Sequence, residues 1–222
     1  MQSTHHNQKN KLLCWLKNNR HVYWTLALIV ILLAYFLPEL LVTDHYFPTQ
    51  TQIDSYIPFV PAFVIFYLLW FPCLFCTGIW LLVKDGEGYR QYMCFLLLAY
   101  MLAAVIYLCW PNGQDLRPTL DAPNGVFEKI LAGLYAMDTN TNVLPSLHVV
   151  GSIGYCGAVL RTKTIRRKWI KAGSCVLAVL ISISTVLVKQ HAVLDLVAGA
   201  ALGLVLFAVV TALFRRRAAR CK

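Results

Sequence analysis

Six long apolar runs dominate the sequence and restrict what the chain can fold into. They cover 22–37, 57–83, 91–110, 143–160, 169–188 and 192–214, and are 16 to 27 residues long. A helix needs about 20 apolar residues to cross the hydrocarbon core of a bilayer. Because lipid cannot hydrogen-bond to the backbone, runs of this kind are expected to form helices. The sequence therefore predicts an all-α polytopic membrane bundle with six transmembrane helices.

The composition supports a membrane protein and excludes several other classes. Of the 222 residues, 59% are hydrophobic and only 14% are charged, which is too apolar for an ordinary soluble domain and excludes intrinsic disorder. Most of the eight cysteines lie in or beside the apolar runs, so they are interpreted as small buried side chains rather than a disulfide framework. Cys73 and Cys76 have the spacing of a metal or redox pair, but no second pair accompanies them.

The positive charges indicate an orientation. If the N-terminus is cytoplasmic, seventeen Lys and Arg residues lie on the cytoplasmic side and only Arg117, Lys129 and Lys189 lie on the other. This is the asymmetry expected from the positive-inside rule, and six spans return the C-terminus to the cytoplasm. The net charge of +10 thus fits an anionic membrane surface better than nucleic acid. The predicted organisation is a basic cytoplasmic N-terminus (1–21), a six-span membrane domain (22–214) and a basic cytoplasmic tail (215–222).

Two long connections are predicted on the non-cytoplasmic side, 43–56 and 111–142. The second contains an apolar stripe at helical spacing, from Val126 to Met137. This stripe predicts a short helix that lies either in the membrane interface or against the bundle. In the fourth run Gly151, Gly154 and Gly157 recur every three residues, which predicts close helix packing.

The polar residues that are hardest to explain by packing fall on the same predicted membrane face. His191 and Asp195 are spaced i, i+4, so a carboxylate can orient an imidazole and leave its other nitrogen free as a nucleophile. The alternative is that the two residues merely satisfy each other at the mouth of a helix. A second imidazole, His148, follows Ser146 at the start of the fourth run, where Pro145 is expected in the first helical turn.

Two cations complete this set. Arg117 in the long outer loop can bind phosphate in a bidentate manner, and Lys189 adds a point charge beside His191. Two cations, two imidazoles, a hydroxyl and a carboxylate predict a site for a phosphoryl group. The acidic residues do not cluster as a two-metal phosphatase would require, so neither a metal nor another cofactor is expected.

These residues resemble the motifs of the type 2 phosphatidic acid phosphatase superfamily. The family's first motif ends in Arg-Pro, matched by Arg117-Pro118, and its second is Pro-Ser-Gly-His, which is similar to 145–148 here. Its third motif runs Ser-Arg, five residues, His, three residues, Asp, and is similar to 184–195. Three positions depart from the pattern: Trp110 replaces a Lys, Leu147 a Gly and Thr185 an Arg. These variants look like the branch that includes inositol phosphorylceramide synthase.

The resemblance implies a mechanism and a substrate class. His191 would attack phosphorus and become a phosphohistidine held by Asp195. His148 would protonate the leaving group and then activate the acceptor, while Arg117, Ser146 and Lys189 would stabilise the phosphoryl oxygens. The leading hypothesis is a multi-pass membrane phosphatase that hydrolyses a lipid phosphomonoester or diphosphate at the non-cytoplasmic face. The alternatives are a lipid phosphotransferase with an alcohol acceptor and, from another class, a non-enzymatic lipid-binding or transport protein.

Overall fold

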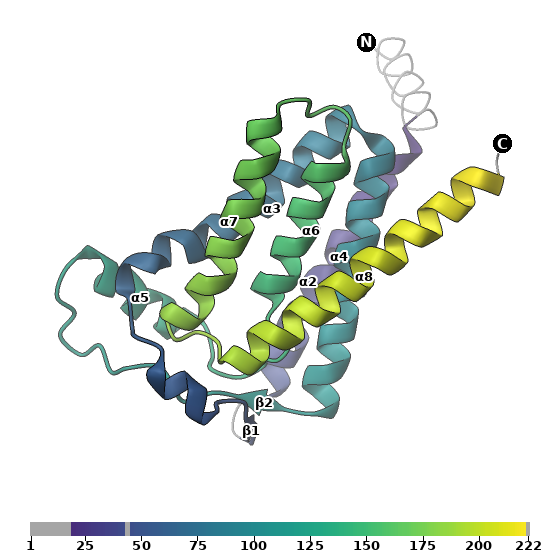
Figure 1. The fold of residues 1–222 in the computed structure, drawn as a ribbon. Coiled ribbons are helices and arrows are strands. Elements are labelled where there is room, and N and C mark those ends of the chain that lie inside the picture. Colours follow the sequence, from purple (N-terminus) through teal and green to yellow (C-terminus); the bar gives the residue numbers. More distant parts are fainter. Residues whose placement is uncertain (1–18, 43–44, 221–222) are drawn as a thin grey trace, which may run out of the picture.

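The computed structural model describes residues 19–42 and 45–220, which are mostly helical (Figure 1). Three short 3-10 helices, η1, η2 and η3, lie at the start and in the first outer loop, and two short strands pair in parallel as β1 and β2. The bounds are η1 (Arg20–Leu26), α2 (Ala27–Leu41), β1 (Phe47–Pro48), η2 (Gln52–Tyr56), η3 (Pro61–Phe63), α3 (Val64–Lys84), α4 (Gly86–Cys109), β2 (Asn112–Gly113), α5 (Val126–Met137), α6 (Leu147–Arg161), α7 (Lys168–Leu187) and α8 (Val193–Arg220).

Each of the six predicted spans forms a helix, and the all-α membrane bundle is confirmed. Five helical segments of the described chain are long and apolar enough to cross a bilayer: Arg20–Leu41, Pro61–Lys84, Gly86–Cys109, Lys168–Leu187 and Val193–Ala219. The fourth predicted span is shorter, since α6 has 15 residues.

The predicted start of the fourth span, at residue 143, is wrong by four residues. The backbone N–H groups of Val143 and Leu144 donate hydrogen bonds to the Asn112 side-chain oxygen at 3.0 and 2.7 Å. These bonds hold this apolar segment against the preceding loop, so the helix begins only at Leu147. Hydropathy alone cannot separate an apolar helix from an apolar segment that is tied down by a distant side chain.

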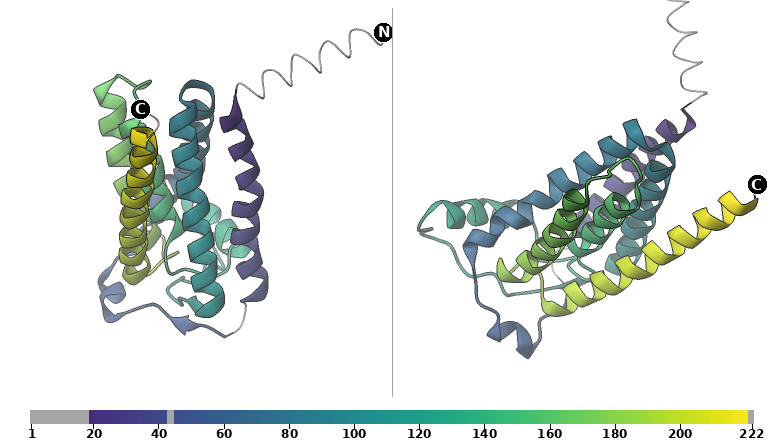
Figure 2. Two further views of the ribbon diagram at one scale, coloured as in Figure 1. Left: turned by 90° about the vertical axis from the view of Figure 1, so that its right-hand side faces the viewer. Right: turned by 45° about the horizontal axis from the view of Figure 1, so that its top comes forward.

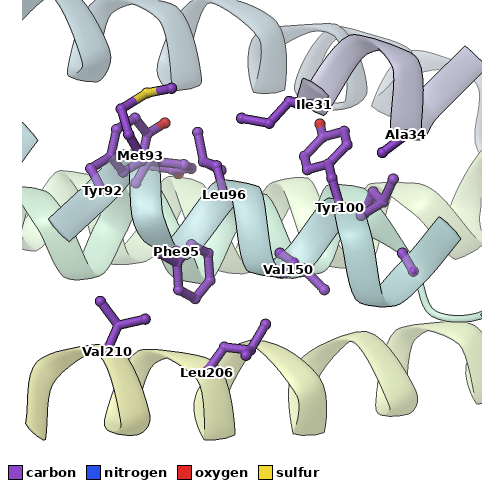
Figure 3. Close-up of a cluster of buried hydrophobic side chains, with 14 of the residues drawn as sticks. Ile31, Ala34, Tyr92, Met93, Phe95, Leu96, Tyr100, Val150, Leu206 and Val210 are labelled. Atoms are coloured by element: carbon purple, nitrogen blue, oxygen red, sulfur yellow. The ribbon is translucent and has the colours of Figure 1, made fainter. Parts of the chain in front are cut away.

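The centre of the bundle is α4, which packs against α2 on one side and α8 on the other (Figure 2). Its buried side chains form half of the main core, and the other half comes from α2, α3, α6, α7 and α8 (Figure 3). Gly154 and Gly157 bring α6 close to its neighbours, as predicted. A Cβ at these positions would lie 2.5 Å from a ring carbon of Phe95 and 2.2 Å from one of Phe207.

The two ends of the bundle differ in character. One end of the bundle carries η2, β1, β2 and α5 (Figure 1). Helices α6 and α8 start at this end, and α7 finishes there. The opposite end holds the α3–α4 and α6–α7 connections and the C-terminal part of α8. Of the seventeen predicted cytoplasmic cations, Lys9, Lys11, Lys17 and Lys222 lie outside the described residues, and the others are at this opposite end. Since α8 runs to Arg220, the predicted boundary at residue 214 lies inside a continuous helix.

The predicted apolar stripe forms α5, which packs on the bundle near η3 and α3. Leu131 is fully buried, and the Tyr135 hydroxyl donates a hydrogen bond to the Val188 carbonyl at 2.6 Å. Val126 and Met137 at its ends remain exposed. Thus one face of α5 contacts the bundle while other apolar side chains stay uncovered.

Candidate active site

Three distant segments meet at the end of the bundle where α6 and α8 begin. The first segment is the loop 110–117, which contains the buried residue Asn112. Its amide nitrogen donates hydrogen bonds to the carbonyl oxygens of Trp110 and Leu144, and its side-chain oxygen accepts hydrogen bonds from the backbone N–H groups of Val143 and Leu144. Gln114 reaches the third segment, donating to the Lys189 carbonyl at 3.0 Å. The loop 110–117 therefore holds the regions around residues 144 and 189 together. The sequence predicts this convergence from topology and motif order, although not the Asn112 and Gln114 contacts that produce it.

His191 and Asp195 are in contact. Nδ1 of His191 lies 3.4 Å from Oδ2 of Asp195, whose side chain is fully buried. The geometry is that of a close polar contact rather than an aligned hydrogen bond, because Nδ1 has no hydrogen-bond partner. Helix α8 begins at Val193, so His191 lies before the helix; it is placed instead by its backbone N–H, which donates to the Thr185 carbonyl at 3.1 Å. Asp195 Oδ2 accepts the Ala192 N–H at 2.8 Å, which fixes the start of α8.

The second histidine lies between two aromatic rings of α3. The ring of His148 is stacked on Tyr67 and Trp70, with centroid distances of 4.1 and 4.2 Å and interplanar angles of 24° and 30°. Its centroid lies 6.0 Å from that of His191. The two imidazoles that the sequence places on one membrane face are thus neighbours, and His148 is held on both ring faces.

Ser146 connects the second and third motifs through its backbone. Its N–H donates to the Asp195 carbonyl at 3.1 Å, and its side chain is fully buried. Ser146 is also the residue before α6, so Pro145 lies outside the helix and not in its first turn; that prediction is wrong. The helix start is displaced because 143–144 is bonded to Asn112.

A small cavity of about 40 Å³ lies between these groups. Both histidines line it, with tyrosines from α2, α3 and α4 and polar side chains from the 138–142 segment. The lining residues are Tyr35, Glu39, Tyr67, Tyr107, Asp138, Thr139, Thr141, Asn142, Val143, Leu147, His148, Gln190 and His191.

Several buried polar atoms at this site have no hydrogen-bond partner. They are Ser146 Oγ, His148 Nε2, His191 Nδ1, Asp195 Oδ1 and Arg117 Nε. Buried polar groups are nearly always hydrogen-bonded, so such a cluster is unusual in a structural core. Ser146 Oγ, His148 Nε2 and Arg117 Nε are groups that phosphoryl oxygens and an attacking or leaving oxygen would use, whereas His191 Nδ1 and Asp195 Oδ1 belong to the His191–Asp195 pair.

Arg117 is held beside the cavity by neighbouring oxygens. Its guanidinium donates to the carbonyl of Asp138 at 2.7 Å, to that of Thr139 and to the side chain of Gln190, and it lies over the Tyr135 ring at 5.0 Å. The carboxylate of Asp138 is 3.9 Å away. Burial raises the pKa of Asp138, and Arg117 opposes this shift. Burial also lowers the pKa of Arg117.

Lys189 is oriented away from the cavity. Its ammonium donates to the carbonyl oxygens of Asp54 and Ile57 at 3.1 and 2.7 Å, beside η2. Burial lowers its pKa, and Asp54 opposes the shift. The positions where the family motifs carry further cations add none: Trp110 is half exposed beside Phe47, and the buried Thr185 hydroxyl donates to Ser182. A phosphate-binding role for Lys189 stays a prediction.

Several residues of this site were not predicted from the sequence. Glu39 on α2 accepts hydrogen bonds from Asn142, at 3.2 Å, and from the Thr139 hydroxyl. An acidic residue at the end of an apolar span was a usable signal, because such groups are rare unless functional. Tyr67 and Trp70 gave no signal, since aromatic residues in an apolar run are equally expected to face lipid. Within residues 19–42 and 45–220, no group of three or more His, Cys, Asp or Glu residues is arranged to hold a metal ion.

Comparison with known families agrees with the site. The family model described as the PAP2 superfamily matches residues 35–209, which run from the second half of α2 into α8 and include every residue of the site described above. Comparisons with curated proteins and with solved structures give no match. The chain is therefore a member of the PAP2 superfamily, and it is a multi-pass membrane protein of the phosphatase type.

Proposed function

We propose that this protein is a lipid phosphate phosphatase that hydrolyses a phosphomonoester or diphosphate lipid through a phosphohistidine intermediate. The observation that carries the proposal is the pair of imidazoles, 6.0 Å apart, one of them contacted by a buried carboxylate at 3.4 Å. A protein that only binds a lipid phosphate would need a cation such as Arg117, but it would not need two imidazole rings arranged in this way.

In the first step, His191 is the nucleophile. Asp195 at Nδ1 favours a proton on that nitrogen, which leaves a lone pair on Nε2. Nε2 attacks phosphorus, the P–N bond forms, and the bond from phosphorus to the lipid oxygen breaks. His148 gives its proton to the departing oxygen, so the lipid leaves as an alcohol, or as a lipid monophosphate where the substrate is a diphosphate.

In the second step, His148 acts as the base. It takes a proton from water, the oxygen attacks phosphorus, and the P–N bond breaks to release inorganic phosphate and free His191. Arg117 and the Ser146 hydroxyl are the groups assigned to the phosphoryl oxygens, and Lys189, whose ammonium is bonded to the carbonyls of Asp54 and Ile57, is assigned only as a more distant positive charge. Positioning and charge supply most of the catalysis in such a reaction, and no metal enters the scheme.

The proposed location of the reaction is the non-cytoplasmic membrane face. The site lies at the end of the bundle opposite to the basic helix connections, and the positive-inside rule assigns that basic end to the cytoplasm.

The direct test is phosphate release by purified protein in the presence of a chelator. Wild type and His191→Ala are compared on a panel of lipid monophosphates and diphosphates and on a water-soluble phosphate ester. We expect release by wild type and loss to background in the variant, because no other group in the scheme can form the intermediate. A matched control, His45→Ala, changes a histidine outside the cavity lining and should keep wild-type activity. Full activity of His191→Ala would contradict the mechanism, and no release from any substrate would favour a binding or transport protein.

A lipid phosphotransferase is the second candidate, and one feature favours it. Leu147, which stands where the family motif has Gly, lines the cavity with an apolar side chain. An apolar lining suits an alcohol lipid as acceptor better than water. Labelled substrate incubated with and without an added alcohol lipid separates the two reactions: transfer predicts label in a new lipid, and hydrolysis predicts label only in free phosphate.

A further inference from the structure

A second, larger cavity lies at the opposite end of the bundle from the histidines. Its volume is about 430 Å³, within the range of ligand pockets of about 300–1,000 Å³. It is formed where α8 diverges from α6 and α7 towards its C-terminal end (Figures 1 and 2). A neighbouring cavity of about 420 Å³ shares the lining residues Glu87 and Gln91 with it, so the two lie next to each other along α4 and α8, and together they are called the groove below.

The inner part of this groove is apolar. Its lining includes Phe95 of α4, Ala158 of α6, and Phe207 and Val210 of α8. Phe95 is nine residues from the start of α4, so the groove extends about 13 Å along that helix. An apolar surface of this depth, beginning at the end of the bundle, matches an acyl chain that enters from one leaflet.

The rim of the groove is positively charged. Lys84, Arg161 and Lys163 line the larger cavity, and Arg90, Arg215 and Arg217 line the neighbouring one. Among the described residues, only Arg90 of these six is paired with a carboxylate, that of Glu87. The carboxylate of Asp85 is also engaged, by the Gly88 N–H at 2.9 Å and the Thr162 hydroxyl at 2.6 Å. Five of the six rim cations therefore form no ion pair among the described residues, and six cations stand against the two carboxylates of Asp85 and Glu87.

The α6–α7 connection, which carries Lys163 of the rim, is held in place by several hydrogen bonds. The ammonium of Lys171 donates to the carbonyl oxygens of Leu160 and Thr162 at 2.7 and 3.2 Å, and Trp80 donates to the Thr164 hydroxyl at 2.9 Å. Arg161 donates to the Thr211 hydroxyl and lies over the Phe207 ring at 5.8 Å. The groove is consequently formed before any ligand enters.

We propose that this groove binds one anionic glycerophospholipid of the leaflet opposite to the active site. An acyl chain occupies the apolar part between α4, α6 and α8, and the head-group phosphate lies among Lys84, Arg161 and Lys163. Basic pockets between transmembrane helices bind anionic head groups by the same combination of charge and apolar contact. The lipid fills the gap between α8 and its neighbours and stabilises the bundle at the end remote from catalysis.

The test compares retained lipid and thermal stability in detergent. Protein is incubated with phosphatidylglycerol, with phosphatidylcholine of the same chains, or with inorganic phosphate, and bound lipid is counted by native mass spectrometry. We expect one retained phosphatidylglycerol and a rise in Tm that the other two additives do not give. Equal retention of phosphatidylcholine, or an equal Tm rise with inorganic phosphate alone, would overturn the proposal.

Two variants locate the site. The pair Lys84→Gln/Lys163→Gln removes two rim charges that make no hydrogen bond or ion pair in the described structure, and should abolish lipid retention at unchanged Tm in detergent alone. The pair Arg166→Gln/Arg167→Gln removes the same amount of charge from the α6–α7 connection, at the same end of the bundle but outside the groove lining, and should retain lipid like wild type. If both pairs of substitutions lowered lipid retention equally, the lipid would be attracted by the overall positive charge of this end and not bound in the groove, and the proposal would be wrong.

A third variant tests the apolar part separately. Ala158→Phe fills the groove without changing a charge and should also abolish retention, whereas retention in this variant contradicts the placement of the acyl chain. Hydrolysis of a water-soluble ester should be unchanged in the two charge-pair variants, so failure of the lipid site is distinguishable from failure of the proposed enzyme.

Discussion

Two aromatic residues determine how His148 can act. Tyr67 and Trp70 lie on opposite faces of its ring, at centroid distances of 4.1 and 4.2 Å, and prevent the ring from turning away from His191. Neither ring touches the reacting atoms in the proposed scheme, so both are positioning residues. Each aromatic contact of this kind is worth about 0.5–1.5 kcal/mol.

We expect Trp70→Leu to slow the reaction by about 10-fold, the equivalent of 1.4 kcal/mol of lost positioning. The loss should be larger for alkyl phosphates than for p-nitrophenyl phosphate, because a good leaving group needs less help from an acid. Phe75→Leu, a change on the same helix at a 70% exposed ring, is the matched control and should keep wild-type rates. Equal slowing of both substrates would mean that Trp70 is only structural.

The guanidinium of Arg117 cannot be replaced by an ammonium. Its two terminal nitrogens donate to Asp138, Thr139 and Gln190, three residues that line the cavity, and these bonds fix the planar group beside it. A lysine ammonium cannot form the same planar set of hydrogen bonds. We therefore expect Arg117→Lys to lower kcat by about 100-fold, which is the loss typical of removing one hydrogen-bond donor to the transition state. The measurement is phosphate release at saturating substrate, with Lys129→Arg on the exposed outer side as control. Wild-type kcat in Arg117→Lys would remove Arg117 from the mechanism.

At the residue scale, motif spacing predicts which side chains meet but not what surrounds them. The spacing places His148, His191 and Asp195 on one membrane face, and the structure brings them together. It cannot show that Lys189 bonds to the carbonyls of 54 and 57, because side-chain direction there depends on a loop some 130 residues away in sequence. Glu39 is likewise joined to 139–142 by contacts that no local pattern encodes.

At the scale of helices, Gly199 lies at a close contact between α8 and Ser146 of the candidate site. A Cβ on Gly199 of α8 would lie 2.7 Å from the carbonyl oxygen of Ser146, a backbone atom that cannot move aside easily. Gly173 on α7 has no neighbour within 4 Å of its Cβ position. The two glycines thus form a matched pair, one at a close helix contact and one in open space.

We expect Gly199→Ala to destabilise the protein by about 1–3 kcal/mol through overpacking and to displace Ser146. Activity should fall together with Tm, because the Ser146 N–H is bonded to Asp195 across the same contact. Gly173→Ala should leave both unchanged. Thermal unfolding in detergent and phosphate release are the measurements, and a silent Gly199→Ala would contradict the α6–α8 contact.

Helix existence was predictable from hydropathy, whereas helix ends were not. All six apolar runs became helices, yet α6 starts at Leu147 because Asn112 holds the preceding residues, and α8 starts at Val193 because Asp195 accepts the Ala192 N–H. Both boundaries depend on single polar side chains, and a hydropathy value averaged over many residues does not detect the effect of one side chain.

At the scale of the whole molecule, the charge difference between the two ends predicts the orientation. In a variant without native cysteines, Asp121→Cys in the outer loop should react with a membrane-impermeant maleimide in intact cells or sealed vesicles of native orientation. Lys163→Cys at the basic end should react only after permeabilisation. Both positions are exposed, so access to reagent rather than burial decides the result. The reverse labelling pattern would invert the proposed topology.

The brevity of α6 has a consequence for how a substrate is reached. Its 15 residues extend about 22 Å, less than the roughly 30 Å of bilayer hydrocarbon, and His148 stands at its first turn. If Arg161 lies at the level of the lipid phosphates on the basic side, we expect the histidines to lie below the level of the lipid phosphates on the other side. In the proposed reaction, a lipid head group would therefore move below the level of its neighbours and lose part of its hydration, and the unpaired Ser146 Oγ and His148 Nε2 would replace contacts with water.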